Sequence, residues 1–326
     1  MRTLVTGGAG FIGSNLVDWL VKEGHEVIVL DNLCTGRLSN LKKAKKKIKF
    51  IKIDIARNEN NLHKFFKKVD WVFHMAGLAD MLPSILNPNK YFYNNVLGTL
   101  NILNASKKAK VKKLIYAASA SCYGITKKNP TSEKFGIDPQ YPYALTKFLG
   151  EQLTINWAKL YSMGNVSLRF FNVYGPRLST KSAYSSVFGI FLAQKLAEKP
   201  LTIVGDGKQT RDFIHVFDVV KAMIKAAKKG KPGKIYNVGS GKESSVNLIA
   251  NIIGGRKVYV PKRPGETRRS LANISKIKKE LNWKPKIKIK KGLEMLLSDI
   301  SRWKEAKVWT VKKIKKDNKN WFKNLK

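Results

Sequence analysis

A glycine-spaced turn near the start of the chain constrains its fold more than any other feature. Residues 3 to 13 read Thr-Leu-Val-Thr-Gly-Gly-Ala-Gly-Phe-Ile-Gly, between an apolar run and an amphipathic stretch. This order predicts a strand, a tight turn and a helix. Gly7 would permit the turn, Gly10 would admit a pyrophosphate close to the backbone, and Gly13 would let helix and strand pack closely. The helix N-terminus would offer free N–H groups to phosphates.

The next apolar run adds a carboxylate to this pattern. Val27-Ile-Val-Leu30 ends in Asp31, at the position where a second strand would finish. A carboxylate there suits the free ribose 2′-hydroxyl of NAD and would repel the 2′-phosphate of NADP. The sequence therefore predicts a dinucleotide-binding unit with NAD as its cofactor.

Apolar runs alternate with helix-length segments through the first half, which predicts an α/β fold with a doubly wound parallel Rossmann sheet. We expect its strands at 2–6, 26–30, 48–53, 70–75, 112–118, 165–171 and 235–238, and helices near 91–109 and 142–161. The elements after Tyr174 are shorter, and those outside about 213–243 predict a smaller mixed α/β domain that binds substrate. The shorter elements comprise a helix near 184–198, strands at 201–204, 213–216 and 257–260, and helices capped by Asp218 and by Ser244-Ser245.

The predicted boundaries follow from this change of texture. We assign residues 1–173 plus about 213–243 to the NAD-binding domain, and 174–212 plus about 244–326 to the substrate-binding domain. The aromatic, lysine-rich extension after about residue 300 is expected to form a helix packed on the latter.

The formal net charge of +41 raises the question of a polyanionic partner. The lysines are dispersed, arginine is scarce and no nucleic-acid-binding motif is recognisable, so we favour a solvated surface and no specific nucleic-acid partner. Two cysteines and four histidines show neither a disulfide framework nor metal-ligand spacing, and predict no metal. No apolar run approaches the length of a bilayer span, which leads us to expect a cytoplasmic protein without membrane insertion.

The chemistry-bearing pattern is Tyr143-Ala-Leu-Thr-Lys147, which follows Pro142 at an expected helix start. The i, i+4 spacing places the phenol and the ammonium on one helical face. A nearby Lys⁺ and a positive nicotinamide ring would both favour phenolate and lower the pKa of Tyr143. Ser119, at the end of the preceding strand, supplies a hydroxyl partner.

Taken in order, these motifs make the chain resemble the extended short-chain dehydrogenases/reductases of the nucleotide-sugar epimerase/dehydratase branch. The resemblance runs to about residue 300 and rests on the glycine turn, Asp31-Asn-Leu, Asp54-Ile55, His74-Met-Ala-Gly77, Asn95-Val-Leu-Gly-Thr99, Ser119 to Gly124, Tyr143/Lys147, Arg169 to Arg177 and Arg211-Asp-Phe-Ile-His215.

The resemblance implies a role for each matching residue. Tyr143 would take the proton from a sugar hydroxyl, Ser119 would bind the same oxygen, and Lys147 would hold the nicotinamide ribose. Besides Tyr143 and Lys147, the implied NAD contacts are Gly7, Gly10, Phe11, Ile12, Gly13, Asp31, Asn32, Asp54, Ile55 and Ala76. The implied contacts to the nucleotide-sugar substrate are Ser84, Ser119, Asn172, Arg211, Arg263 and Ser270. Asn95 would order the loops, His74 and His215 would be structural, and a homodimer is expected.

The residues after Ser119 bear on the reaction. Dehydratases of this branch carry Thr-Asp-Glu where this chain has Ser119-Ala120-Ser121, and alanine and serine cannot act as the acid/base couple that expels water. A UDP-sugar 4-epimerase working through a 4-keto intermediate is therefore favoured over a 4,6-dehydratase. A small residue at Ser270 would leave room for an N-acetyl group, so both UDP-hexoses and UDP-N-acetylhexosamines are expected substrates.

Two alternatives stay open on the sequence. A UDP-uronate 4-epimerase or decarboxylase could use Arg177 to anchor the sugar carboxylate. A more remote alternative, suggested by the charge of +41, is a polyanion-binding protein that reuses the fold.

Overall fold

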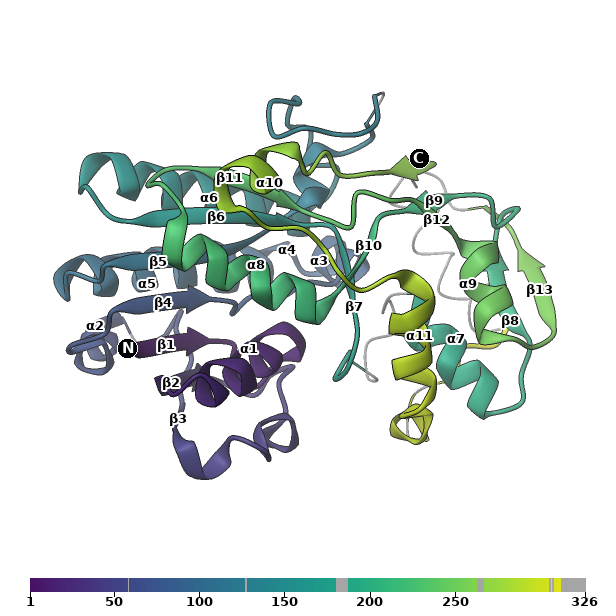
Figure 1. Cartoon of the computed structure of the whole chain (residues 1–326), viewed down its shortest axis with the longest axis horizontal. Helices are drawn as coiled ribbons and strands as arrows, with labels where there is room; N and C mark the ends of the chain where they lie inside the picture. Colours follow the sequence, from purple (N-terminus) through teal and green to yellow (C-terminus); the bar gives the residue numbers. More distant parts are fainter. Residues whose placement is uncertain are drawn as a thin grey trace.

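Seven parallel strands form the central sheet of the computed structural model, which describes residues 1–57, 59–126, 128–179, 187–262, 267–304, 306 and 308–311. The order is β11-β6-β5-β4-β1-β2-β3, so the direction of winding reverses between β1 and β4 (Figure 1). The strands are β1 (Arg2–Thr6), β2 (Glu26–Asp31), β3 (Ile48–Lys52), β4 (Trp71–His74), β5 (Lys113–Ser119), β6 (Asn165–Phe170) and β11 (Ile235–Val238). This confirms the predicted Rossmann sheet. Ligands of such sheets bind at the carboxyl edge beside the reversal.

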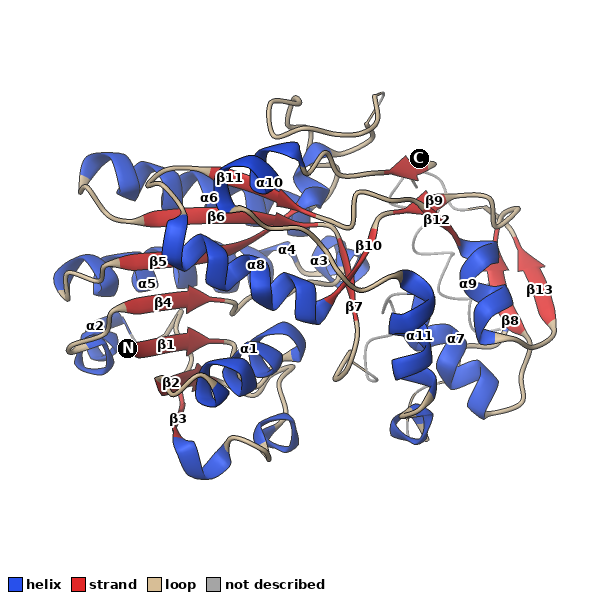
Figure 2. Ribbon diagram, viewed as in Figure 1, coloured by secondary structure: helices blue, strands red, loops and turns tan. Residues whose placement is uncertain are grey.

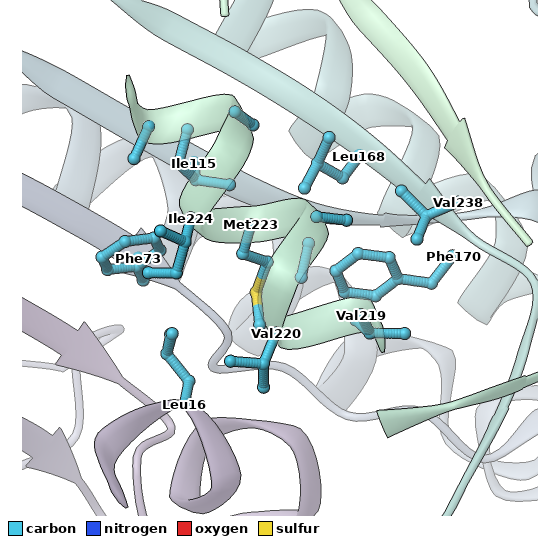
Figure 3. Packing of buried hydrophobic residues seen from close by; sticks show 14 of the residues in the cluster. Leu16, Phe73, Ile115, Leu168, Phe170, Val219, Val220, Met223, Ile224 and Val238 are labelled. Carbon is cyan, nitrogen blue, oxygen red and sulfur yellow. The ribbon is translucent and has the colours of Figure 1, made fainter. Parts of the chain in front are cut away.

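Helices cover both faces of the sheet (Figure 2). On one face lie α1 (Phe11–Lys22) and α8 (Val216–Lys229); on the other lie α5 (Gly98–Lys108) and α6 (Pro142–Leu160). Figure 3 shows the packing on the first face, where Val220 and Met223 of α8 lie between Leu16 of α1 and the strand residues. Burial of such apolar side chains supplies about 25 cal/mol per Å² and fixes each helix on its face.

Two helix starts differ from what the sequence suggests. The α8 helix begins at Val216, and His215, not Asp218, is its N-cap; the ring nitrogen Nδ1 accepts from Phe217 N at 3.3 Å. Asp218 lies in the first turn, where Oδ2 accepts from the backbone N–H groups of residues 286 and 287. The expected helix over 91–109 is broken into α4 (Pro88–Tyr91), a π-helical segment Phe92–Leu97, and α5. Such π-turns often mark functional sites.

A second group of elements packs around its own apolar cluster. It contains α7 (Val187–Leu196), α9 (Val246–Ile253) and α11 (Ile289–Leu297), with the parallel pair β8 (Leu201–Val204) and β13 (Lys257–Val260). Ser245 caps α9 as expected, because its hydroxyl accepts from Leu248 N. Trp303 is buried in this cluster, on the short 3₁₀ helix Ile300–Trp303. The expected helix farther along the C-terminal extension falls largely outside the described residues, and the division into two domains stays a prediction.

Short strands join the two groups of elements. β7 (Asn172–Tyr174) pairs in parallel with β10 (Phe213–His215). β9 (Thr210–Arg211) lies between β12 (Ser244–Ser245) and β14 (Arg269–Ser270) in a small mixed sheet. Within the described ranges, no helix has both the length and the apolar composition that crossing a bilayer requires.

The α6 helix lies unusually close to the sheet. A Cβ atom built on Gly150 would lie 2.3 Å from the hydroxyl oxygen of Tyr116, which is buried in β5. That hydroxyl donates to the carbonyl of Lys147 at 3.2 Å. Glu151, the residue after Gly150, accepts a hydrogen bond from the guanidinium of Arg169 in β6 at 2.6 Å, and both side chains are buried. The close approach and the buried pair fix α6 along its middle.

Replacing Gly150 by alanine should therefore destabilise the protein, although alanine is the better helix former. We expect Gly150→Ala to lower the free energy of unfolding by about 1–3 kcal/mol, the usual cost of overpacking a core. Urea unfolding followed by circular dichroism measures it. Gly136→Ala is the matched control: Gly136 is exposed and its added Cβ would meet nothing within 4 Å. Equal stability of the two variants would contradict the packing described.

Candidate active site

The glycine turn has the tight geometry that the sequence predicts. Gly7 has φ +66°, and a Cβ there would lie 2.7 Å from Ala76 N. A Cβ on Gly13 would lie 2.3 Å from the carbonyl oxygen of Gly7. The α1 helix starts after Gly10 without a side-chain cap, which leaves the N–H groups of its first turn, from Phe11 and Ile12 onward, available to an anion.

The end of β2 places a carboxylate beside this turn. Asp31 Oδ2 accepts from Ala9 N at 2.9 Å, and Oδ1 accepts from Leu33 N at 2.8 Å. Burial raises the pKa of Asp31, against the lowering effect of these two hydrogen bonds. Asn32 donates to Asp54 Oδ2 at 3.2 Å, and Ile55, three residues beyond the end of β3, is buried. Three features of this region fit NAD. The glycine turn has no room for a Cβ atom at Gly7 or Gly13, the α1 helix starts without a side-chain cap, and backbone hydrogen bonds hold the Asp31 carboxylate in place.

The segment after β4 is tied to α6 by one side chain. Asn95 Oδ1 accepts from Leu78 N at 2.8 Å, and Nδ2 donates to Leu78 O and to Thr146 Oγ1, each at 3.0 Å. The π-helical segment thus directs Asn95 into the loop that contains Ala76, as expected of a residue that orders the loops.

His74 and His215 are packed structural residues, as the sequence suggests. The His74 ring lies between the hydroxyls of Thr6 and Thr99, at 2.7 and 2.9 Å, and burial lowers its pKa to about 3. His215 caps α8 against the Tyr174 ring, and burial lowers its pKa to about 4.

Ser119, Tyr143 and Lys147 converge at the carboxyl edge of the sheet. Ser119 is the last residue of β5. Its hydrogen bond with the half-buried Tyr143 phenol acts to lower the pKa of Tyr143. Lys147 Nζ lies 4.5 Å from the centroid of the Tyr116 ring, and the residue is 6% exposed. Burial lowers the pKa of Lys147 to about 7, while the charge of Glu151 acts to raise it.

The pKa of Tyr143 shifts opposite to the prediction from sequence. Burial raises it, Ser119 lowers it by hydrogen bonding, and the charge of Asp80 raises it again. The prediction was wrong for the protein without bound cofactor because desolvation of a phenolate outweighs the local hydrogen bond. It also relied on a fully charged Lys147, whose own burial disfavours the ammonium.

The predicted substrate residues are brought together only in part. Arg211 in β9 lies in register with Ser270 in β14, and its charge acts on the phenol of Tyr141. The Tyr141 ring stacks on that of Tyr143, with centroids 6.3 Å apart and an interplanar angle of 15°. Arg211 therefore lies near Tyr141, whose ring neighbours that of Tyr143, and the substrate roles of Arg211 and Ser270 stay predictions.

The other three residues have different surroundings. Asn172, in β7, donates from Nδ2 to the carbonyl of Asp212 at 3.4 Å. Ser84 is buried in α3 (Met81–Leu86), where its hydroxyl donates to the carbonyl of Met81. Arg263 lies outside the described residues. The roles of all three stay predictions.

Sequence reasoning missed the carboxylate that organises this side. Asp212 is buried, accepts from Ser240 Oγ at 2.7 Å and Gly241 N at 2.9 Å, and also accepts from Ala272 N at 3.1 Å. It thus joins the loop after β11 to the segment after β14, and burial raises its pKa. Asp212 belongs to the Arg211-Asp-Phe-Ile-His215 motif, but nothing in the sequence assigned its carboxylate a role. No group of three or more His, Cys, Asp or Glu residues that could hold a metal occurs among the residues described.

The NAD dependent epimerase/dehydratase family matches residues 3–239. A putative UDP-glucose 4-epimerase of Methanocaldococcus jannaschii is 38% identical over 302 residues, covering 90% of this chain and 97% of that protein.

Two solved structures are also similar. The UDP-N-acetylglucosamine 4-epimerase of Methanobrevibacter ruminantium, in complex with UDP-N-acetylmuramic acid, superposes with TM-score 0.86 at 33% identity, covering 91% of this chain and 98% of that one. The UDP-glucuronic acid 4-epimerase of Bacillus cereus, in complex with UDP-glucuronic acid and NAD, gives 0.84 at 32% identity, covering 93% and 99%.

The buried ammonium of Lys147 should make stability depend on pH. Its pKa is about 7 in the folded protein and about 10.4 when unfolded. Between these values the unfolded chain binds the extra proton, so the free energy of unfolding rises with pH through this window. The cost of burying the charge is fully present below about pH 7.

The Lys147→Met variant isolates this effect. Without ligand, the wild type should gain several kcal/mol, at most about 4, relative to the variant between about pH 6 and about pH 10. Denaturant unfolding of both proteins at several pH values measures the difference. A difference in stability that does not change with pH would show that Lys147 is charged as easily as an exposed lysine.

Proposed function

Because the chain belongs to the NAD dependent epimerase/dehydratase family, we propose that it inverts C4 of a UDP-hexose or a UDP-N-acetylhexosamine through a 4-keto sugar. The observation that carries the proposal is the convergence of Ser119, Tyr143 and Lys147 beside the glycine turn. The residues after Ser119 add no acid/base pair, and inversion at C4 needs none.

NAD bound in this site would supply a reversible acceptor for the hydride of C4. The turn at Gly7, Gly10 and Gly13, with the uncapped start of α1, would hold its pyrophosphate. Asp31 would accept hydrogen bonds from the adenosine ribose, and Asn32, Asp54 and Ile55 would border the adenine. Lys147 would hold the nicotinamide ribose, from the same helical face as Tyr143.

Residues of this chain would remove and return the proton of the sugar 4-hydroxyl. Tyr143 Oη would take the proton from the sugar 4-hydroxyl and return it after the sugar has turned over. Ser119 would bind the same sugar oxygen and keep it near the phenol. Arg211 and Asn172 would hold the substrate diphosphate, because guanidinium and amide donors suit its charge and geometry. We propose Arg263 as a second cation beside the diphosphate and Ser84 as a further substrate contact. An anchored diphosphate leaves the hexose free to present either face.

Two further observations limit the reaction. Ser121 donates from Oγ to Ser119 Oγ at 2.8 Å and, like Ala120, has no carboxyl with which to expel water, which counts against a 4,6-dehydratase. The guanidinium of Arg177 is paired with Asp18 of α1, which counts against its use as the anchor of a uronate. UDP-glucuronate is the competing substrate because one of the similar solved structures is the UDP-glucuronic acid 4-epimerase of Bacillus cereus.

A homodimer and the two-domain division given above complete the proposal. The dimer is tested by light scattering after size-exclusion chromatography, in which a mass near twice 36.8 kDa would support it. A monomer at working concentration would remove the dimer and leave the assigned chemistry untouched.

Replacing the base tests the catalytic role. Tyr143→Phe should lower kcat about 10³-fold, within the usual range for loss of a positioned general base, and leave the Kd for UDP-sugar within about threefold. Proton NMR of UDP-glucose and UDP-N-acetylglucosamine, each with catalytic NAD⁺, follows C4 inversion. Tyr259→Phe is the control, since Tyr259 is 56% exposed on β13. Undiminished turnover by Tyr143→Phe would remove Tyr143 from the mechanism.

A bulky residue at position 270 should narrow the substrate range. Ser270→Tyr is expected to lower kcat/KM for UDP-N-acetylglucosamine at least about tenfold, with a small change for UDP-glucose, because one group excluded from a pocket is worth about 1–3 kcal/mol. Ser298→Tyr, at an exposed position after α11, is the matched control. An equal loss for both sugars would show that Ser270 does not border the N-acetyl group.

A further inference from the structure

The buried carboxylate of Asp212 has no assigned part in the reaction, yet four donors bind it. Oδ1 accepts from the backbone N and the Oγ of Ser240, at 2.5 and 2.7 Å. Oδ2 accepts from Gly241 N at 2.9 Å and from Ala272 N at 3.1 Å. Ser240 and Gly241 follow β11, an edge strand of the central sheet, whereas Ala272 follows β14 of the small mixed sheet. One side chain therefore fastens the small sheet to the central one.

The backbone of Asp212 joins three of the proposed substrate contacts. Its N–H donates to the carbonyl of Ser270 at 2.7 Å, and its carbonyl accepts from Asn172 N at 3.1 Å and from Asn172 Nδ2 at 3.4 Å. Arg211 is the residue before it in the chain. The strands that carry these contacts, β7, β9 and β14, are only two or three residues long. Such short strands cannot fix their own positions and depend on what anchors them.

The packing around the carboxylate is too tight for it to lie elsewhere. A Cβ built on Gly239 would lie 2.7 Å from Asp212 Oδ2 and 2.5 Å from the Cβ of Ala272. Glycine at this position lets the loop after β11 approach, so that its next two N–H groups reach the carboxylate. A buried charge is tolerated only when hydrogen bonds replace its water, so the four donors hold the carboxylate in one place.

From these contacts we propose that Asp212 is a positioning residue, which holds Arg211 and Asn172 where they bind the substrate diphosphate. The inference rests on the proposed function, in which these two residues contact the diphosphate. A carboxylate offers about four acceptor sites, and the four donors occupy them. The side chain therefore acts through the protein and not on the substrate.

The test is the affinity for UDP, measured by isothermal titration calorimetry on the NAD-loaded protein. Asp212→Asn keeps the size of the side chain, but in either orientation its NH₂ group would face at least one of the backbone N–H groups that the carboxylate now binds. It should raise the Kd for UDP at least about threefold, and Arg211→Gln at least about tenfold, because hydrogen bonds between charged groups are the strongest. Gly239→Ala, which displaces the carboxylate and keeps its charge, should also weaken UDP binding.

Asp218→Asn is the matched control for the loss of a buried carboxylate. Asp218 is fully buried and accepts from the backbone N–H groups of residues 286 and 287, and none of the proposed substrate contacts is among the partners that the structure describes for it. Its Kd for UDP should stay within about twofold of the wild-type value, because sites without shared partners act independently. Gly136→Ala is the control for Gly239→Ala. Equal losses of UDP affinity in Asp212→Asn and Asp218→Asn would refute a positioning role.

Two further measurements test how Asp212 acts. In an Arg211→Gln background, Asp212→Asn should cost less UDP affinity than in the wild type, since one of the two contacts that it positions is already gone. Without ligand, hydrogen exchange at the amides of Gly241 and Ala272 should be faster in Asp212→Asn, with exchange in α6 unchanged. Full additivity, unchanged exchange at both amides, or an unchanged Kd in a folded Asp212→Asn protein would overturn the proposal.

Turnover separates positioning from chemistry. In Asp212→Asn the KM for the UDP-sugar should rise while kcat stays within about threefold, because a diphosphate contact is the same in the ground state and the transition state. A fall in kcat with KM unchanged would contradict the proposal. If the wild type binds UDP but epimerises neither sugar, the proposed reaction fails and the UDP titrations still test Asp212. If the wild type does not bind UDP, the diphosphate contacts and this inference fall together.

Discussion

The docking of α6 on the central sheet is the constraint on which the site depends. Tyr143 and Lys147 lie on its first turns, so any shift of the helix moves both. Gly150 lets the helix lie against the Tyr116 hydroxyl, and that hydroxyl donates to the carbonyl of Lys147. The buried Glu151–Arg169 pair then ties the helix to β6. Loss of one partner of such a pair leaves an uncompensated buried charge, which costs about 3–5 kcal/mol.

The same docking explains the electrostatics of the site. Burial of Lys147 at the carboxyl edge of the sheet removes water from its ammonium and lowers its pKa to about 7. Tyr143 is desolvated with it, so ionisation of the phenol depends on hydrogen-bond donors that approach from β5. The many exposed lysines that give the net charge of +41 take no part in this balance. Those in the described part of the chain that are exposed lie in water, where opposite charges and salt screen them.

Much of the fold could be predicted from sequence because its signals are local. The glycine turn, the seven apolar runs and the Ser245 cap each depend on residues close together in the chain, and each is found where expected. Asp218 was expected to cap α8, and this was wrong because a distant segment, residues 286 and 287, donates to its carboxylate. The role of Asp212 and the direction of the Tyr143 shift also depend on tertiary contacts and burial, which spacing alone does not report. The site residues were named by motif, but the contact of the Ser121 hydroxyl with Ser119 and the stacking of Tyr141 on Tyr143 are seen only in the folded chain.

The central claim is that one site removes the hydrogen from C4 and returns it to the opposite face of the sugar. Its most direct test follows the hydrogen: UDP-glucose and UDP-N-acetylglucosamine carrying deuterium at C4 are incubated with the enzyme and catalytic NAD⁺ in ordinary water. The account predicts that the C4 epimer forms and keeps the deuterium at C4, with no accumulation of NADH. Loss of the label to solvent, a lasting build-up of NADH, or no conversion of either sugar would contradict it.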